Sequence, residues 1–100
     1  MKVNKAHDGN SASSFREAFA DLYDEYMPKV YRYVSYRVND VAVAEDLTSM
    51  IFEKALTKFH EYRADKGAIS TWLFTIARNT VIDHYRTEGR KKTVPLDSLI

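Results

Sequence analysis

The side chains best suited to bind a ligand recur at helical spacing in the second half of this 100-residue chain. Asn79, Asp83 and Arg86 are spaced i, i+4, i+7, and Arg78 lies slightly over two turns before Arg86. Tyr85 places an aromatic ring beside this row. Cations bind phosphates, amides contact base edges and rings stack on bases, so one rigid helix of this kind could read nucleic acid. The alternative is a solvated helix face with ordinary ion pairs.

No other group of residues indicates catalysis or a metal site. The chain has no cysteine, and His7, His60 and His84 lack the spacing of metal ligands. It also lacks a glycine-rich phosphate loop and a Ser–His–Asp order that would suggest a nucleophile. We therefore expect a protein that is not an enzyme, with no catalytic residue, no metal and no cofactor.

The charge is balanced overall but is concentrated at one end. The net charge is +1, from 15 basic and 14 acidic residues, which excludes indiscriminate binding of nucleic acid through total charge. From Arg78 to Lys92, however, five basic residues stand against two acidic ones. No run approaches the roughly 18 apolar residues of a membrane span, and the N-terminus lacks the apolar core of a secretory signal. We expect a cytoplasmic protein that does not contact a membrane.

The apolar pattern predicts a first helix that starts at Phe15. Ser14 and Glu17 have the spacing of a capping box at its N-terminus. Apolar residues then recur in steps of three and four, which is typical of an amphipathic helix. They are Phe15, Phe19, Leu22, Tyr26, Val30 and Tyr33. Pro28 lies inside this helix, and we expect it to kink the helix rather than split it.

Two further helices complete the predicted fold. The second should run from about Val41 to Glu61, capped by Asn39 or Asp40. Its inner line is Leu47, Ile51, Ala55, Lys58 or Phe59, and Tyr62. The third should start at the N-cap Ser70, bury Trp72, Leu73, Ile76 and Ala77, and end after Thr87 at Glu88 and Gly89. The pattern therefore predicts an all-α fold: a compact three-helix bundle with a kinked first helix and a loop between the second and third helices.

Two motifs make the chain resemble bacterial sigma factors of the extracytoplasmic-function (ECF) group. Residues 70–86, S-T-W-L-F-T-I-A-R-N-T-V-I-D-H-Y-R, resemble the promoter-reading helix, whose pattern is (S/T)-T-W-L-x-x-I-A-x-N-x-x-x-D-x-x-R. Residues 44–56, A-E-D-L-T-S-M-I-F-E-K-A-L, resemble the family stretch A-E-D-L-(T/V)-Q-x-x-F-x-(K/R)-A. The resemblance covers roughly residues 15–96. It implies the all-α fold that the apolar pattern also predicts.

The motif in residues 44–56 implies a polymerase-binding helix. In the family this helix docks on a coiled coil of the RNA polymerase clamp. The residues implied at this contact are Asp46, Ser49, Phe52 and Glu53. Carboxylates on a rigid helix can form charge-assisted bonds with arginines of a partner, although an acidic face alone is common on protein surfaces. Ser49 departs from the family pattern, which has a glutamine there.

The second half of the chain carries the implied DNA-binding residues. In the family, the loop before the promoter-reading helix forms the pocket for a base flipped out of the non-template strand of the −10 element. The implied DNA contacts are Tyr62, Arg63, Ala64, Asp65, Lys66, Gly67 and Ala68 in the loop, and Arg78, Asn79 and Arg86 in the helix. Ile69 stands where the family often has an aromatic residue. Asp83 is expected to orient a neighbouring arginine, and Trp72 to anchor the loop in the core.

The resemblance implies a sigma factor domain that binds core RNA polymerase and recognises and helps melt the promoter −10 element to start transcription. Its partners would be the polymerase clamp, promoter DNA (mainly the non-template single strand) and an anti-sigma factor. We expect residues 1–14 to form a flexible tail, 15–89 the sigma-factor region 2 domain, and 90–100 the basic start of an interdomain linker. The alternatives are a helical protein-interaction module that binds a regulator without DNA contact, and a small helical binder of double-stranded DNA.

Overall fold

The computed structural model describes residues 11–92, and the side chains of residues 14–89. Three long helices make up most of this region: α2 (Ser11–Ser35), α3 (Val41–Lys58) and α4 (Ile69–Lys92). Two short 3-10 helices, η1 (Phe59–Glu61) and η2 (Ala64–Lys66), connect α3 to α4. The predicted all-α architecture is confirmed, since the described residues contain no strand.

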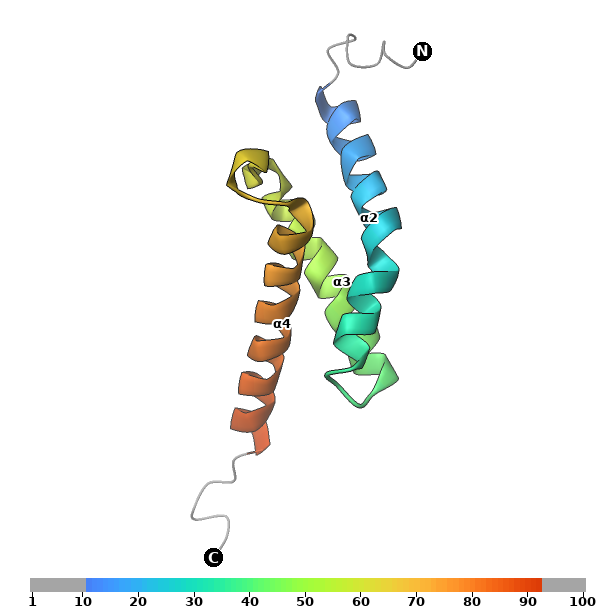
Figure 1. Ribbon diagram of the computed structural model, residues 1–100. Coiled ribbons are helices and arrows are strands. Elements are labelled where there is room, and N and C mark those ends of the chain that lie inside the picture. Colours follow the sequence, from blue (N-terminus) through green and yellow to red (C-terminus); the bar gives the residue numbers. More distant parts are fainter. Residues whose placement is uncertain (1–10, 93–100) are drawn as a thin grey trace, which may run out of the picture.

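The helix α3 holds the bundle together, because it packs against both α2 and α4 (Figure 1). The α2–α4 contact is smaller. Each helix contributes fully buried side chains to one core, including Val30 from α2, Ile51 from α3 and Leu73 from α4. Burial of an aliphatic side chain of this size stabilises a fold by about 1.5–3 kcal/mol. The core therefore fixes the face that each helix leaves exposed.

The first helix is longer than the sequence pattern predicted. It begins at Ser11, so Ser14 lies inside the helix and the prediction of an N-terminal capping box at Ser14 was wrong. The helix continues through Pro28 as one element, and the kink stays a prediction. Pro28 and Asp24 are both exposed, so the carbonyl group that loses its intrahelical partner can bind water. The rest of the expected tail, residues 1–10, lies outside the described residues.

Asp40 caps the second helix, and it is one of the two residues, Asn39 and Asp40, that the sequence predicted as the cap. Its Oδ1 accepts hydrogen bonds from the backbone N–H groups of Ala42 at 2.8 Å and Val43 at 3.1 Å. Its extended backbone is the usual conformation of an N-cap residue. The α-helix ends at Lys58, and η1 continues the turn to the predicted end at Glu61.

Both predicted ends of the third helix were wrong. The carbonyl group of Ala68 already accepts the backbone N–H of Trp72 at 3.2 Å, so Ser70 lies in the first turn and is not the N-cap. At the other end, α4 passes through Gly89 and reaches Lys92. Gly67, and not Gly89, has the positive φ angle among the described glycines. The residues after Gly89 are an arginine and lysines, which favour helix, so the helix has no local reason to stop there.

Candidate functional site

The exposed side of α4 carries the predicted polar row. Arg78, Asn79 and Arg86 are exposed, whereas Leu73 and Ala77 on the opposite side are completely buried. At about 100° per residue, Asn79 and Arg86 lie within about 20° of each other around the helix axis. Arg78 lies about 80° from Arg86. Helical spacing therefore divides the row into two lines, one with Asn79 and Arg86 and the other with Arg78 and Tyr85.

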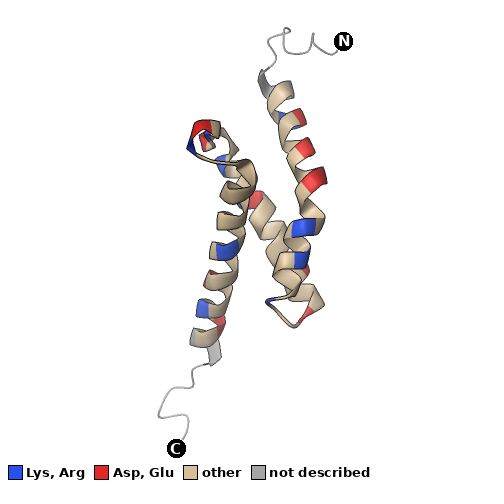
Figure 2. Ribbon diagram, in the orientation of Figure 1, with Lys and Arg blue, Asp and Glu red and all other residues tan. Residues whose placement is uncertain are grey.

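The two arginines of α4 differ in their partners. Arg86 Nη1 lies 3.4 Å from Asp83 Oδ1, so Asp83 orients a neighbouring arginine as expected. Both side chains are about 60% exposed, and an exposed ion pair contributes about 0–1 kcal/mol, so a phosphate could replace the carboxylate. Among the described residues, no carboxylate pairs with Arg78. Figure 2 shows basic residues on α4 and on the second half of α2.

The loop between α3 and α4 is closed by contacts among its own residues. Tyr62 Oη donates a hydrogen bond to the Gly67 carbonyl group at 2.8 Å, which spans the loop. Gly67 has a φ angle of +146°, a conformation that side chains rarely adopt. Arg63 binds Asp65 through two hydrogen bonds, Nε–Oδ1 at 3.2 Å and Nη2–Oδ2 at 3.1 Å. The loop is therefore an ordered element with a fixed shape.

A small hollow lies between this loop and the start of α4. Its volume is about 230 Å³, below the roughly 300–1,000 Å³ of pockets that hold drug-sized ligands. Its lining consists of Glu61, Tyr62, Arg63, Lys66, Gly67, Ala68, Thr71 and Trp72. Five of the seven predicted loop residues are in this lining, and Ala64 and Asp65 are not. The sequence reading missed Glu61 and Thr71, which flank the loop in sequence.

Trp72 anchors the loop to the helix bundle, as expected. Its half-buried ring lies 5.5 Å from the ring centroid of Tyr62 and 6.1 Å from that of Phe59. The Phe59 ring in turn contacts Phe15 and Phe19 of α2 edge-on, at 5.3 and 5.5 Å. This aromatic chain connects the wall of the hollow to the core.

The exposed face of α3 carries three of the four predicted polymerase contacts. Asp46, Ser49 and Glu53 are all exposed and lie within about 60° around the helix axis. Phe52, the fourth implied contact, does not share this exposed face, and its role at the polymerase stays a prediction. Its side chain is 6% exposed and packs edge-on against Tyr23, with ring centroids 5.0 Å apart. Phe52 therefore supports the α3 surface from below.

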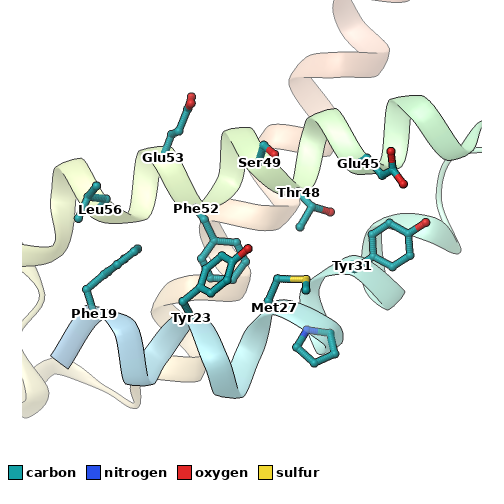
Figure 3. A pocket seen from close by; sticks show the side chains of 11 residues that line it. Phe19, Tyr23, Met27, Tyr31, Glu45, Thr48, Ser49, Phe52, Glu53 and Leu56 are labelled. Carbon is teal, nitrogen blue, oxygen red and sulfur yellow. The ribbon is translucent and has the colours of Figure 1, made fainter. Parts of the chain in front are cut away.

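A groove of about 810 Å³ runs between α2 and α3 (Figure 3). Its lining consists of Phe19, Tyr23, Met27, Pro28, Tyr31, Glu45, Thr48, Ser49, Phe52, Glu53 and Leu56. The sequence analysis did not identify this groove, although Tyr23 in its lining is 42% exposed. The signal was present: Tyr23, Met27 and Tyr31 recur every four residues, beside the main apolar line of α2. The α3 face therefore borders an apolar groove.

In the part of the chain that the structure describes, no cluster of His, Asp and Glu residues could hold a metal ion. No helix there is long and apolar enough to span a bilayer.

The Sigma-70 region 2 family model matches residues 22–91. The chain is 46% identical over 71 residues to the ECF RNA polymerase sigma factor BldN of Streptomyces coelicolor, covering 71% of this chain and 27% of that protein. It is 35% identical over 75 residues to the RNA polymerase sigma factor SigZ of Bacillus subtilis, covering 75% and 42%. A solved RsbN–BldN complex contains a similar chain, with a TM-score of 0.64, 39% identity and coverage of 95% and 67%. The chain spans less than half the length of these two curated relatives.

Proposed function

This chain belongs to the Sigma-70 region 2 family, and from that premise we propose that it binds core RNA polymerase and recognises the promoter −10 element. The two motifs that resembled ECF sigma factors lie within the matched residues 22–91. The observation that carries the proposal is that one small fold exposes two different polar faces. The α3 face is acidic, whereas the exposed face of α4 has basic and amide side chains beside an ordered hollow.

The DNA contact would involve the non-template single strand of the −10 element. The Asn79–Arg86 line supplies an amide for base edges and a guanidinium for phosphates. The hollow has an aromatic wall at Tyr62 and cationic side chains at Arg63 and Lys66, and its small volume suits one flat base. Flipping a base costs a few kcal/mol of unstacking, which such a pocket would offset and so help melt the promoter.

The polymerase contact would use the exposed face of α3. Asp46 and Glu53 present carboxylates, and Ser49 a hydroxyl group, to a basic partner helix such as one strand of a coiled coil. Phe52 would act indirectly by holding this surface in place. The chemistry of transcription would belong to the polymerase, and this chain would have no catalytic group of its own.

A regulator would occupy the groove between α2 and α3. Its apolar lining suits the apolar face of an amphipathic helix, which is a common mode of peptide recognition. One relative, BldN, has been solved in a complex with RsbN. We propose an anti-sigma factor as the partner here. The same groove is the observation that favours the alternative function, a protein-interaction module without DNA contact.

Asn79→Ala distinguishes these two functions. A promoter reader should lose base-dependent binding to single-stranded oligonucleotides that vary a −10-like sequence one base at a time, measured by fluorescence anisotropy. Ser14→Ala removes a neutral polar group at an exposed residue near the start of α2 and should behave like wild type. Pull-down of core RNA polymerase should be unaffected by either change. If wild type and Asn79→Ala discriminated bases equally, Asn79 would have no part in promoter reading.

A further inference from the structure

Arg37, in the turn between α2 and α3, is held in place by three contacts. Its guanidinium carbon lies 3.7 Å from the centroid of the Tyr33 ring, in a cation–π stack. Its Nη1 donates a hydrogen bond to the Tyr33 carbonyl group at 3.0 Å. Its own carbonyl group accepts a hydrogen bond from Tyr85 Oη of α4. Arg37 is nevertheless exposed, so an ordered cation faces solvent.

No carboxylate among the described residues neutralises Arg37. The same holds for Arg78, whereas Arg63 and Arg86 pair with Asp65 and Asp83. An arginine side chain carries about 2 kcal/mol of rotamer entropy, part of which is normally lost when it binds. In Arg37 that loss occurs when the protein folds, so the guanidinium is preorganised for an anion. Its planar fork of N–H donors matches the oxygens of a phosphate group.

Arg37 and Arg78 lie along the same edge of α4. Arg78 and Tyr85 are seven residues apart, which places them on one line of the helix about 10 Å apart. Tyr85 contacts Arg37 directly. Phe74 lies on this edge too, and its ring packs against Tyr33 at 5.4 Å. The two cations therefore flank a seam between α2 and α4 that is distinct from the Asn79–Arg86 line.

We propose that Arg37 and Arg78 form a phosphate-binding edge for the DNA strand whose bases the Asn79–Arg86 line contacts. The inference rests on the proposed function, and it adds α2 and its turn to the DNA interface. The edge would fix the path of the strand across α4, because backbone contacts set position without reading sequence. A purely structural role is also defined: Arg37 caps the carbonyl end of α2. Capping accounts for the hydrogen bond from Arg37 to the Tyr33 carbonyl group. It does not account for Arg78, a second arginine on the same edge without a carboxylate partner among the described residues.

Arg37→Gln separates charge from capping, because glutamine keeps an N–H donor for the Tyr33 carbonyl group. The probe is a fluorescent thymidine oligonucleotide, titrated with the full chain from about 50 to about 200 mM NaCl. For single strands, the slope of log affinity against log salt is about −0.7 per phosphate contact. Arg37→Gln and Arg78→Gln should each make the slope shallower by about 0.7. Wild type should then lose about 2.6-fold more affinity than either variant over this range.

Arg32→Gln is the matched control, because Arg32 is an exposed arginine in the last turn of α2 outside the proposed edge. It should leave the slope unchanged. A slope that stays at the wild-type value in Arg37→Gln overturns the phosphate-binding edge alone. An unchanged slope with impaired pull-down of core polymerase also overturns it and assigns the charge to a protein partner. Absence of any salt-dependent binding by wild type overturns the proposed function and the edge together.

Discussion

Tyr62→Phe removes one oxygen atom and should loosen the loop that forms the candidate base pocket. The Tyr62 hydroxyl group donates the 2.8 Å hydrogen bond to the Gly67 carbonyl group, while the ring packs against Trp72. Phenylalanine keeps the ring contact and loses only the bond, which is worth about 0.5–1.5 kcal/mol. A central value of about 1 kcal/mol corresponds to about five-fold in the equilibrium between closed and open loop. If only the closed loop binds a flipped base, apparent affinity falls by up to about five-fold.

The assay is fluorescence anisotropy with a −10-like single-stranded oligonucleotide, accompanied by a thermal melt of each variant. Tyr23→Phe is the matched control, because Tyr23 is 42% exposed, lies in the groove between α2 and α3, and loses the same oxygen atom. We expect weaker binding in Tyr62→Phe only, at an unchanged melting temperature, because the bond closes a local loop. Equal affinities in the two variants would refute the reasoning. So would a melting temperature lowered by about 4–8 °C, the shift expected when 1 kcal/mol of global stability is lost from a domain of this size.

Two further predictions concern the other face and the fold. Asp46→Ala should weaken binding to core RNA polymerase without changing stability, because the Asp46 carboxylate is exposed on α3. Asp21→Ala, which removes an exposed carboxylate of α2, is the control. Equal pull-down of polymerase by the two variants would contradict docking through the α3 face. Asp40→Ala should destabilise the fold by about 1 kcal/mol, because two backbone N–H groups lose their acceptor. The measurement is the midpoint of denaturant unfolding, with Asn39→Ala as the control variant. Equal midpoints for the two variants would show that the cap contributes nothing to stability.

Local patterns predicted the helices well because helix formation depends on short-range spacing. The steps of three and four that bury Leu22 and Val30, and the cap at Asp40, act within a few residues of each other. Helix ends were less predictable. Ser70 and Gly89 have the right side chains for a cap and a stop, but both lie inside α4, because helix ends are weakly encoded by single residues.

For the candidate DNA-binding residues too, spacing predicted part of the arrangement and the tertiary structure decided the rest. Spacing placed Arg78, Asn79 and Arg86 on the exposed side of one helix, and the structure agrees. Spacing also puts Arg78 on the line of Tyr85, but only the structure shows that this line faces the α2–α3 turn. Arg37 received no role from the sequence, because the contact that joins it to α4 reaches across about 50 residues to Tyr85. Such a contact leaves no local pattern.

By itself, the sequence determined the class of fold, the family and the chemical character of each helix face. Apolar periodicity selects which side of a helix is buried, and the two motifs carry the family resemblance. Only the tertiary structure decided which side chains act together. Phe52, implied at the polymerase contact by its motif, lines the groove between α2 and α3 because it packs against Tyr23 of α2. Arg37 and Arg78 became one edge because the α2–α3 turn meets α4. Both outcomes depend on how helices pack in space, which spacing along one helix does not encode.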